Sequence, residues 1–255
     1  MRHLFSPRFA IGLLLVLVTA IAGVAVWARK GSNGTDQLRI ENKTRSLIVE
    51  SVAELETIQI EPQKKRRRFK VTVKNGYSQS LVAYSFRQQD SSVGKGTVSG
   101  VETNGATIGW VLPPNGTDAT SFLAPSEGEV VITLAAVLLE DGTGDGDTQA
   151  LSRLREVRAG VKMAYQQIVP LLRRAANSTE AVAPDIAFQS LEGEIAAIPE
   201  KTVPPNSRRG FHEAKEFLVT NLKELESKFR SDQNLQHRSE ISKILARVEE
   251  MLAKL

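Results

Sequence analysis

Residues 9–28 form an uncharged apolar stretch, FAIGLLLVLVTAIAGVAVWA, close to the start of the chain. A helix of about 20 apolar residues is long enough to span the hydrocarbon core of a bilayer. Trp27 lies near the end of the stretch, and Arg29 and Lys30 follow it, as is typical of the interfacial flank of a membrane helix. We therefore predict that residues 1–30 are an uncleaved signal anchor, and that residues 9–28 attach the chain to a membrane as a transmembrane helix.

A cleaved signal peptide is the alternative interpretation of the same residues, and the chain would then be secreted. Ala20-Ile21-Ala22 and Val26-Trp27-Ala28 both resemble the small-x-small sequence at which signal peptides are cut. The uncharged run is longer than the apolar core of about 7–15 residues in an ordinary signal peptide. Its length favours the anchor.

Two arguments about the side of the membrane on which the soluble part lies disagree. A first apolar segment near the N-terminus usually acts as an export signal, which favours an extracytoplasmic location for the part that follows. Basic residues near a membrane helix tend to stay in the cytoplasm, and more of them follow the segment than precede it. We favour a single-pass membrane protein whose soluble part is extracytoplasmic.

The 255-residue chain contains no cysteine and carries a formal net charge of +4. The lack of cysteine excludes disulfides, thiol catalysis, iron–sulfur clusters and cysteine-bound zinc. Arg2, Arg8, Arg29 and Lys30 account for the excess of positive charge, because without them 29 basic residues stand against 29 acidic ones. The soluble part is therefore neutral, and the composition is typical of a bacterial envelope protein whose cores fold without disulfides.

Residues 38–147 have the pattern of a β-sandwich, behind a short polar tether at residues 31–37. Apolar and polar residues alternate with a period of two, and turn-forming residues interrupt the alternation. About seven short strands are expected. Phe69–Val73 and Val82–Phe86 are expected to form a hairpin, and Glu129–Leu139 is apolar enough to be a central strand covered on both faces.

The apolar period changes to 3.6 after residue 147, which predicts helices in the rest of the chain. An amphipathic helix is expected over residues 148–172, with Pro170 kinking or ending it. Residues 173–206 contain several prolines and are expected to be a linker with one short helix, Asp185–Ala197. Residues 207–255 carry two apolar stripes that predict an antiparallel helical hairpin, a surface for self-association or for a protein partner. A parallel coiled coil is the alternative.

The strand pattern Phe69-x-Val71-x-Val73-x-Asn75, followed by Val82-x-Tyr84-x-Phe86, resembles the central hairpin of Ig-like modules in uncharacterised bacterial exported proteins. The resemblance covers about residues 45–172 and implies an Ig-like fold and an exported location, with no catalytic residues. The fold class predicted is α+β multidomain: an N-terminal transmembrane helix, an Ig-like β-sandwich and a C-terminal α-helical region.

The segment 140–147 is acidic and rich in glycine, and Asp141, Asp145 and Asp147 offer the oxygen ligands that Ca²⁺ prefers. An EF-hand loop counted from Asp145 fails, because Ala150 stands where the template requires glycine. The other interpretation is a strand-to-helix loop whose aspartates cap the following helix. No further cofactor is predicted.

The run Lys64, Lys65, Arg66, Arg67 and Arg68, continued by Lys70 and Lys74, is a dense positive charge. It predicts contact with an anionic surface such as lipid headgroups or cell-wall polymers. The alternative is a solvated loop beside an edge strand, where cations discourage aggregation. Nucleic acid is not an expected partner, because no aromatic residues are interleaved with the cations.

Two further residue pairs are candidates for chemistry. His212 and Glu216 share a helix face but lack a third metal ligand, so surface residues are expected. Tyr84 and Trp110 are the aromatic pair for a sugar-binding platform, although core packing is favoured for both. No HExxH, GxSxG, SxxK or P-loop motif is present, and no catalytic residue is predicted.

These observations predict a membrane-anchored envelope protein that serves binding or assembly rather than catalysis. Two alternatives remain at this point: a calcium-dependent module or enzyme that uses the loop 140–147, and a carbohydrate or cell-wall adhesin that uses the sandwich.

Overall fold

The computed structural model describes residues 38–61, 64–90, 97–104, 111–178, 183–231 and 237–255. The predicted anchor and tether, and Trp110, lie outside this part of the chain. Within it, no helix combines the length and apolarity needed to cross a bilayer.

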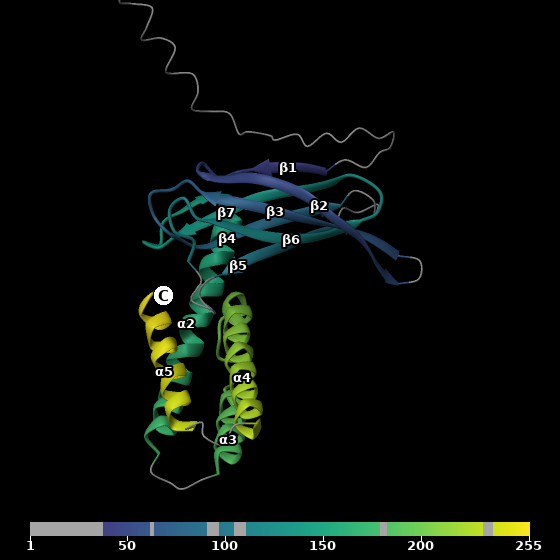
Figure 1. Cartoon of the computed structure of the whole chain (residues 1–255). Helices are drawn as coiled ribbons and strands as arrows, with labels where there is room; N and C mark the ends of the chain where they lie inside the picture. Colours follow the sequence, from purple (N-terminus) through teal and green to yellow (C-terminus); the bar gives the residue numbers. More distant parts are fainter. Residues whose placement is uncertain (1–37, 62–63, 91–96, 105–110, 179–182, 232–236) are drawn as a thin grey trace, which may run out of the picture.

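The chain is an α+β protein in which eight described strands precede the described helices (Figure 1). The strands are β1 (Leu38–Asn42), β2 (Leu47–Glu61), β3 (Lys64–Asn75), β4 (Leu81–Asp90), β5 (Thr97–Asn104), β6 (Thr117–Pro125), β7 (Val130–Leu139) and β8 (Gly144–Gly146). The helices are α2 (Thr148–Asn177), α3 (Pro184–Ala197), the short 3₁₀ helix η1 (Pro205–Ser207), α4 (Arg208–Ser231) and α5 (His237–Ala253).

Two sheets enclose one apolar core. The first has the order β1-β7-β4-β5 with β8 also paired to β7, and the second has the order β2-β3-β6. Inward positions at every second residue meet between them, among them Phe69, Phe86 and Phe122. The Phe86 and Phe122 rings pack edge to face at 5.2 Å, so the two sheets are joined by direct aromatic contact.

The prediction of a central strand at Glu129–Leu139 is confirmed by β7. This strand pairs with β1 in parallel and with β4 in antiparallel register. One of its faces contributes Ile132, Leu134 and Val137 to the core between the sheets, and the other contributes Ala135 and Ala136 to a cluster beneath α2. Burial on both faces is the physical reason why its sequence is apolar throughout.

The predicted hairpin of Phe69–Val73 with Val82–Phe86 is wrong. These runs belong to β3 and β4, which lie in different sheets. The turn between them crosses from one sheet to the other, and the buried Asn75 side chain holds it by donating to the carbonyl oxygens of Gln79 and Leu112, each at 2.9 Å. A hairpin and a sheet-to-sheet corner need the same alternation and turn residues, so the pattern alone does not separate them.

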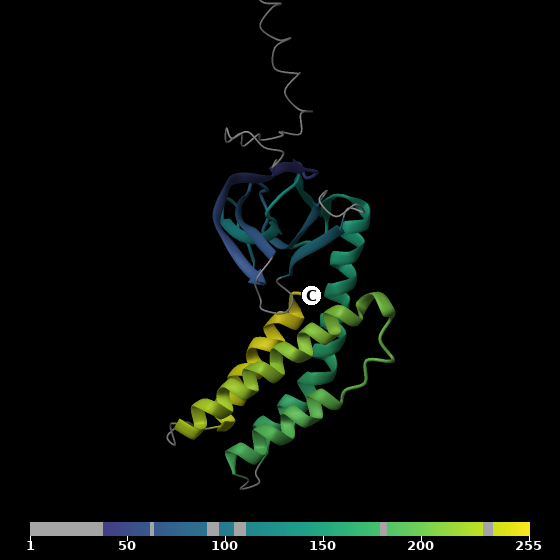
Figure 2. The ribbon, with the colours of Figure 1, turned by 90° about the vertical axis from the view of Figure 1, so that its right-hand side faces the viewer.

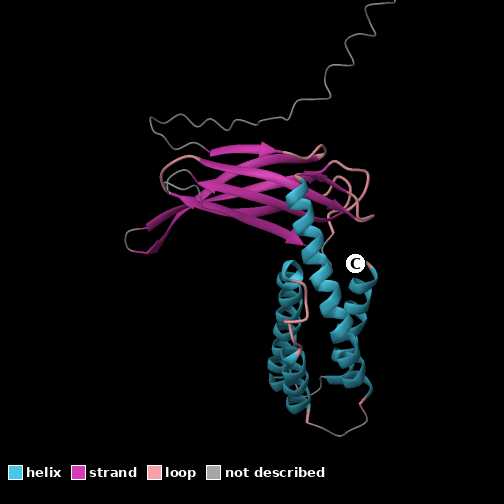
Figure 3. Ribbon diagram, turned by 180° about the vertical axis from the view of Figure 1, so that it is seen from behind, coloured by secondary structure: helices cyan, strands magenta, loops and turns pink. Residues whose placement is uncertain are grey.

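Helix α2 joins the sheets to the helical region (Figure 3). The Asp147 carboxylate accepts a hydrogen bond from the Ala150 amide at 3.0 Å and caps its start. Its first turns cover the outer face of the first sheet, on the side of the sandwich away from β2 and β3 (Figure 2). The helix runs through the exposed Pro170 to Asn177, beyond the predicted end at residue 172, because Ala175 and Ala176 still pack against the core of the helical region.

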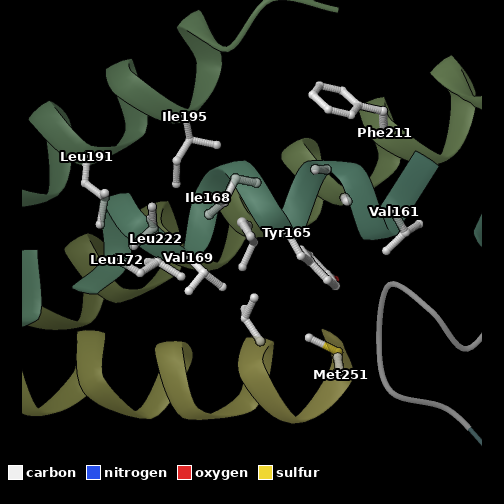
Figure 4. Close-up of a cluster of buried hydrophobic side chains, with 14 of the residues drawn as sticks. Val161, Tyr165, Ile168, Val169, Leu172, Leu191, Ile195, Phe211, Leu222 and Met251 are labelled. Atoms are coloured by element: carbon white, nitrogen blue, oxygen red, sulfur yellow. The ribbon is translucent and has the colours of Figure 1, made fainter. Parts of the chain in front are cut away.

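The helical region packs around α2 (Figure 4). Side chains of α3, α4 and α5, such as Leu191, Phe211 and Met251, surround Tyr165 and Ile168 of α2. The helices α4 and α5 make their closest backbone approaches to α2 rather than to each other. The predicted packing of the two apolar stripes of residues 207–255 against each other therefore needs correction, because α2 supplies the surface on which both stripes are buried.

Candidate functional site

The strongest candidate site is a row of cations on the outer face of the three-stranded sheet. Arg66, Arg68, Lys70 and Lys74 lie at alternate positions of β3, with Thr72 between the last two. We call these four cations the cationic stripe. Successive side chains on one face of a strand are about 7 Å apart, and the stripe is therefore about 27 Å long.

The outward direction of the stripe follows from the burial of its neighbours. Phe69, Val71 and Val73 are fully buried in the core between the sheets. Because side chains alternate along a strand, the intervening residues point to the opposite side. The described helices pack on the other sheet through α2, so none of them packs on this face of β3 (Figure 2).

The two strands that flank the cationic stripe, β2 and β6, differ in charge. On β6, uncharged residues stand opposite it: Thr117, Ala119, Ser121, Leu123 and Pro125. On β2, Glu56 stands opposite Arg68 and forms an ion pair with it at 3.5 Å. The β6 side of the stripe is thus free of acidic residues at registered positions, and its positive potential extends over that side.

Exposed apolar side chains lie on the same sheet. Ile48 is 51% exposed and pairs with Lys74, and Leu123 is 40% exposed and pairs with Arg68. Leu55, at a bulge in β2, is 50% exposed. The sequence analysis did not select these residues. The alternation holds the signal that could have found them: Ile48 stands between core residues 47 and 49, and Leu123 between core residues 122 and 124, so both must point outward.

The predicted basic run, Lys64 to Arg68, does not lie on one face, because successive side chains of β3 point to opposite sides of the sheet. Lys65 and Arg66 are exposed, whereas Arg67 points inward and is 9% exposed. The Arg67 guanidinium donates to the carbonyl oxygens of Pro125 and Gly128 and lies 5.3 Å from the centre of the Phe69 ring. Arg67 therefore has a structural role, and Lys64, which begins β3, stands at the tip of the β2–β3 pair.

The aspartates of the predicted calcium loop have separate protein partners. The Asp145 carboxylate accepts hydrogen bonds from the Tyr77 hydroxyl and from the backbone and side chain of Arg45. Burial raises the pKa of Asp145, but these hydrogen bonds outweigh it and leave the pKa below its usual value. Burial and the bond to Asp145 raise the pKa of Tyr77 to about 12.

The other two aspartates stabilise the loop and the helix. Asp141 accepts from the Thr143 hydroxyl and amide and from Gln79, which lowers its pKa. The Asp147 carboxylate caps α2, and the Ala150 amide lowers its pKa. Among the described residues there is no group of three or more aspartate, glutamate or histidine side chains that could hold a metal ion. The structure does not gather Asp141, Asp145 and Asp147 into one coordination site.

The His212 and Glu216 pair lies on the exposed side of α4 as part of a polar cluster. His212 contacts Glu200 and Glu216, each at 3.1 Å, and the hydrogen bond that its ring donates to the Glu200 carboxylate raises the pKa of His212. The buried Lys215 ammonium donates to the carbonyl oxygens of Ala196 at 3.0 Å and Ile198 at 2.8 Å. Lys215 thus supplies hydrogen bonds to carbonyl groups at the C-terminal end of α3, a role that the sequence did not indicate.

Tyr84 is fully buried, and its hydroxyl donates to Asp118 at 2.8 Å. Tyr84 is therefore a core residue, as the favoured interpretation predicted, and its ring is not available to a sugar.

Comparisons with known proteins assign no function to this arrangement. The sequence matches no known family model and no curated protein. A solved structure described as the X-ray structure of Northeast Structural Genomics Consortium target SoR45 is 20% identical, with a TM-score of 0.28, and the match covers 40% of this chain and 80% of that chain.

Proposed function

We propose that this protein is a membrane-anchored, non-enzymatic binding module that holds an anionic polymer or surface against the cationic stripe. Residues 9–28 anchor it as a single-pass protein, an Ig-like β-sandwich carries the stripe, and the soluble part is extracytoplasmic. The observation that carries the proposal is the alignment of Arg66, Arg68, Lys70 and Lys74 on one exposed sheet face.

Charge geometry supports this role better than catalysis. A row of cations spaced by about 7 Å, and by about 14 Å across Thr72, meets an extended anionic ligand at several points, and each contact adds a modest free energy. The flanking β6 positions are uncharged, so they do not compete for the cations.

Soluble inorganic polyphosphate is a direct probe of the stripe. We expect the full-length chain, in non-ionic detergent micelles, to bind polyphosphate with an affinity that falls as salt rises, because exposed charges are screened. A variant with Arg66→Gln, Arg68→Gln, Lys70→Gln and Lys74→Gln should bind at least about tenfold more weakly, since four outward-facing cations are lost.

A variant with the same change in net charge is the matched control. Arg153, Lys162, Lys201 and Lys223 are exposed in the helical region, and replacing these four with glutamine should leave binding within about twofold of the wild type. Equal loss in both variants would show that only net charge matters and would overturn the assignment of the site. Binding that is absent in the wild type would overturn the proposed function.

A further inference from the structure

We infer that the partner of the cationic stripe is the anionic lipid surface of the bilayer that anchors the chain, with Ile48 and Leu123 entering the headgroup region beside the cations. This inference rests on the proposed function, because it names the ligand of the same site.

The composition of the sheet face favours lipid over a soluble polymer. Ile48 adjoins Lys74 at one end of the stripe, and Leu123 adjoins Arg68 towards the other. Both apolar side chains are at least 40% exposed, on the face opposite the apolar core. A soluble polyanion gains nothing from exposed isoleucine and leucine, whereas a membrane interface accepts cations and apolar side chains together.

The position of the sheet in the chain keeps it near the bilayer. Nine residues separate Ala28, the last residue of the apolar stretch, from Leu38, which begins β1. Ten residue steps join Ala28 to Leu38, and even fully extended they reach no further than about 36 Å. Strand β2 follows β1 after a short turn, while the helical region lies on the far side of the sandwich from β1 (Figures 1 and 2). The sandwich, rather than the helices, is thus held close to the membrane.

Because the tether is short, weak contacts are sufficient to dock the sheet on the bilayer. Once the chain is anchored, docking of the sheet is an intramolecular step with a high effective concentration. Each Lys or Arg close to an anionic leaflet strengthens binding roughly fivefold. Four cations and two apolar side chains then favour the docked state without a deep binding pocket.

The absence of native cysteine allows a site-specific test on the full-length chain. A single Leu123→Cys variant carrying an environment-sensitive dye would be reconstituted through residues 9–28 into vesicles of neutral phosphatidylcholine, or of phosphatidylcholine mixed with anionic phosphatidylglycerol. Quenching by a lipid-borne quencher reports contact with the bilayer. Ser190→Cys, an exposed position on α3, provides the control label.

We expect strong quenching of the label at residue 123 in anionic vesicles, weak quenching in neutral vesicles and weak quenching of the label at residue 190 in both. Added salt should release the docked state in the otherwise unaltered chain. Glutamine at the four stripe positions should lower the ratio of docked to undocked protein at least about tenfold, whereas the helical control substitutions should not.

The inference would be overturned by equal quenching in neutral and anionic vesicles, or by loss of quenching in the helical control variant. If polyphosphate binding depends on the stripe but lipid contact does not, the proposed function stands and the lipid assignment fails. If neither depends on the stripe, both fail.

Discussion

At the scale of single residues, Asp145 joins three distant parts of the chain. Its carboxylate accepts hydrogen bonds from Tyr77 at the corner between the sheets and from Arg45 in the turn before β2. Asp145 itself lies in β8, just before α2. Because these bonds tie the junction between the sandwich and α2, they set where the helical region begins relative to the sheets.

Replacing Tyr77 with phenylalanine should destabilise the purified residues 31–255 by about 2 kcal/mol at neutral pH, since a hydrogen bond to a charged acceptor is lost. The difference in the free energy of unfolding between wild type and Tyr77→Phe should also depend on pH. Tyr77 has a folded pKa of about 12, above its ordinary value of 10.0, so its contribution is complete below pH 10 and is lost as the pH rises through 12.

Urea unfolding at neutral and alkaline pH would check this expectation. Wild type and Tyr77→Phe should converge in stability between about pH 10 and 12, because the two proteins differ only in this hydroxyl. The buried Tyr84 and Tyr165 are present in both and cancel in the comparison. A constant difference across that range would contradict the assigned role of the hydroxyl.

Asp147→Ala should cost about 1 kcal/mol, because the Ala150 amide loses its N-cap acceptor. Glu140→Ala, at an exposed position of the same loop, is the control and should change stability by less than about 0.5 kcal/mol. The lowered pKa of Asp147 means that the benefit is present above pH 4 and lost as the pH falls through the folded pKa. Acid titration of the two variants would separate the cap from nonspecific effects.

At the scale of elements, the crossing of α2 and α4 depends on two glycines. A Cβ atom built on Gly160 would lie 1.9 Å from the Ser207 carbonyl oxygen, and one built on Gly210 would lie 1.9 Å from the Val157 carbonyl oxygen. These neighbours are backbone atoms and cannot move aside as a flexible side chain does. The close approach of the two helices therefore requires glycine at both positions.

We expect Gly160→Ala to destabilise the protein by about 3 kcal/mol or more, as overpacking outweighs the gain in helix propensity. Gly193→Ala in α3 is the matched control, since nothing lies within 4 Å of its added Cβ. That substitution should stabilise the protein by up to about 1 kcal/mol. Chemical denaturation measures both, and a neutral Gly160→Ala would show that the helices separate readily at this crossing.

The existence of most elements could be predicted from the sequence, but their pairing could not. The strand Glu129–Leu139 and the short helix at Asp185–Ala197 correspond to β7 and α3 within a residue or so. The partner of Val82–Phe86 could not be predicted, because β3 and β4 share a turn without sharing a sheet. Likewise, the apolar stripes of α4 and α5 specify that they are buried, but not that α2 buries them.

At the scale of the whole molecule, the predicted anchor is open to a simple test. We expect the full-length chain to stay in the membrane pellet after alkaline carbonate extraction, and a chain that begins at residue 31 to be released. A periplasm-active reporter fused after Leu255 should give signal and a cytoplasm-active reporter should not. The opposite reporter result would place the soluble part in the cytoplasm, and an N-terminus beginning near residue 23 or residue 29 would show cleavage.

The sequence by itself determined the local properties of this protein: the apolar length of residues 9–28, the change from period two to period 3.6 after residue 147, and the cations at alternate positions of β3. Only the tertiary structure decided that Arg67 is turned into the protein while Arg66, Arg68, Lys70 and Lys74 share the outer face of their sheet with Ile48 and Leu123. The physical reason is that periodicity and hydropathy depend on neighbours in the chain. Which face of a sheet remains uncovered depends on how distant elements pack, and here α2 covers the other sheet.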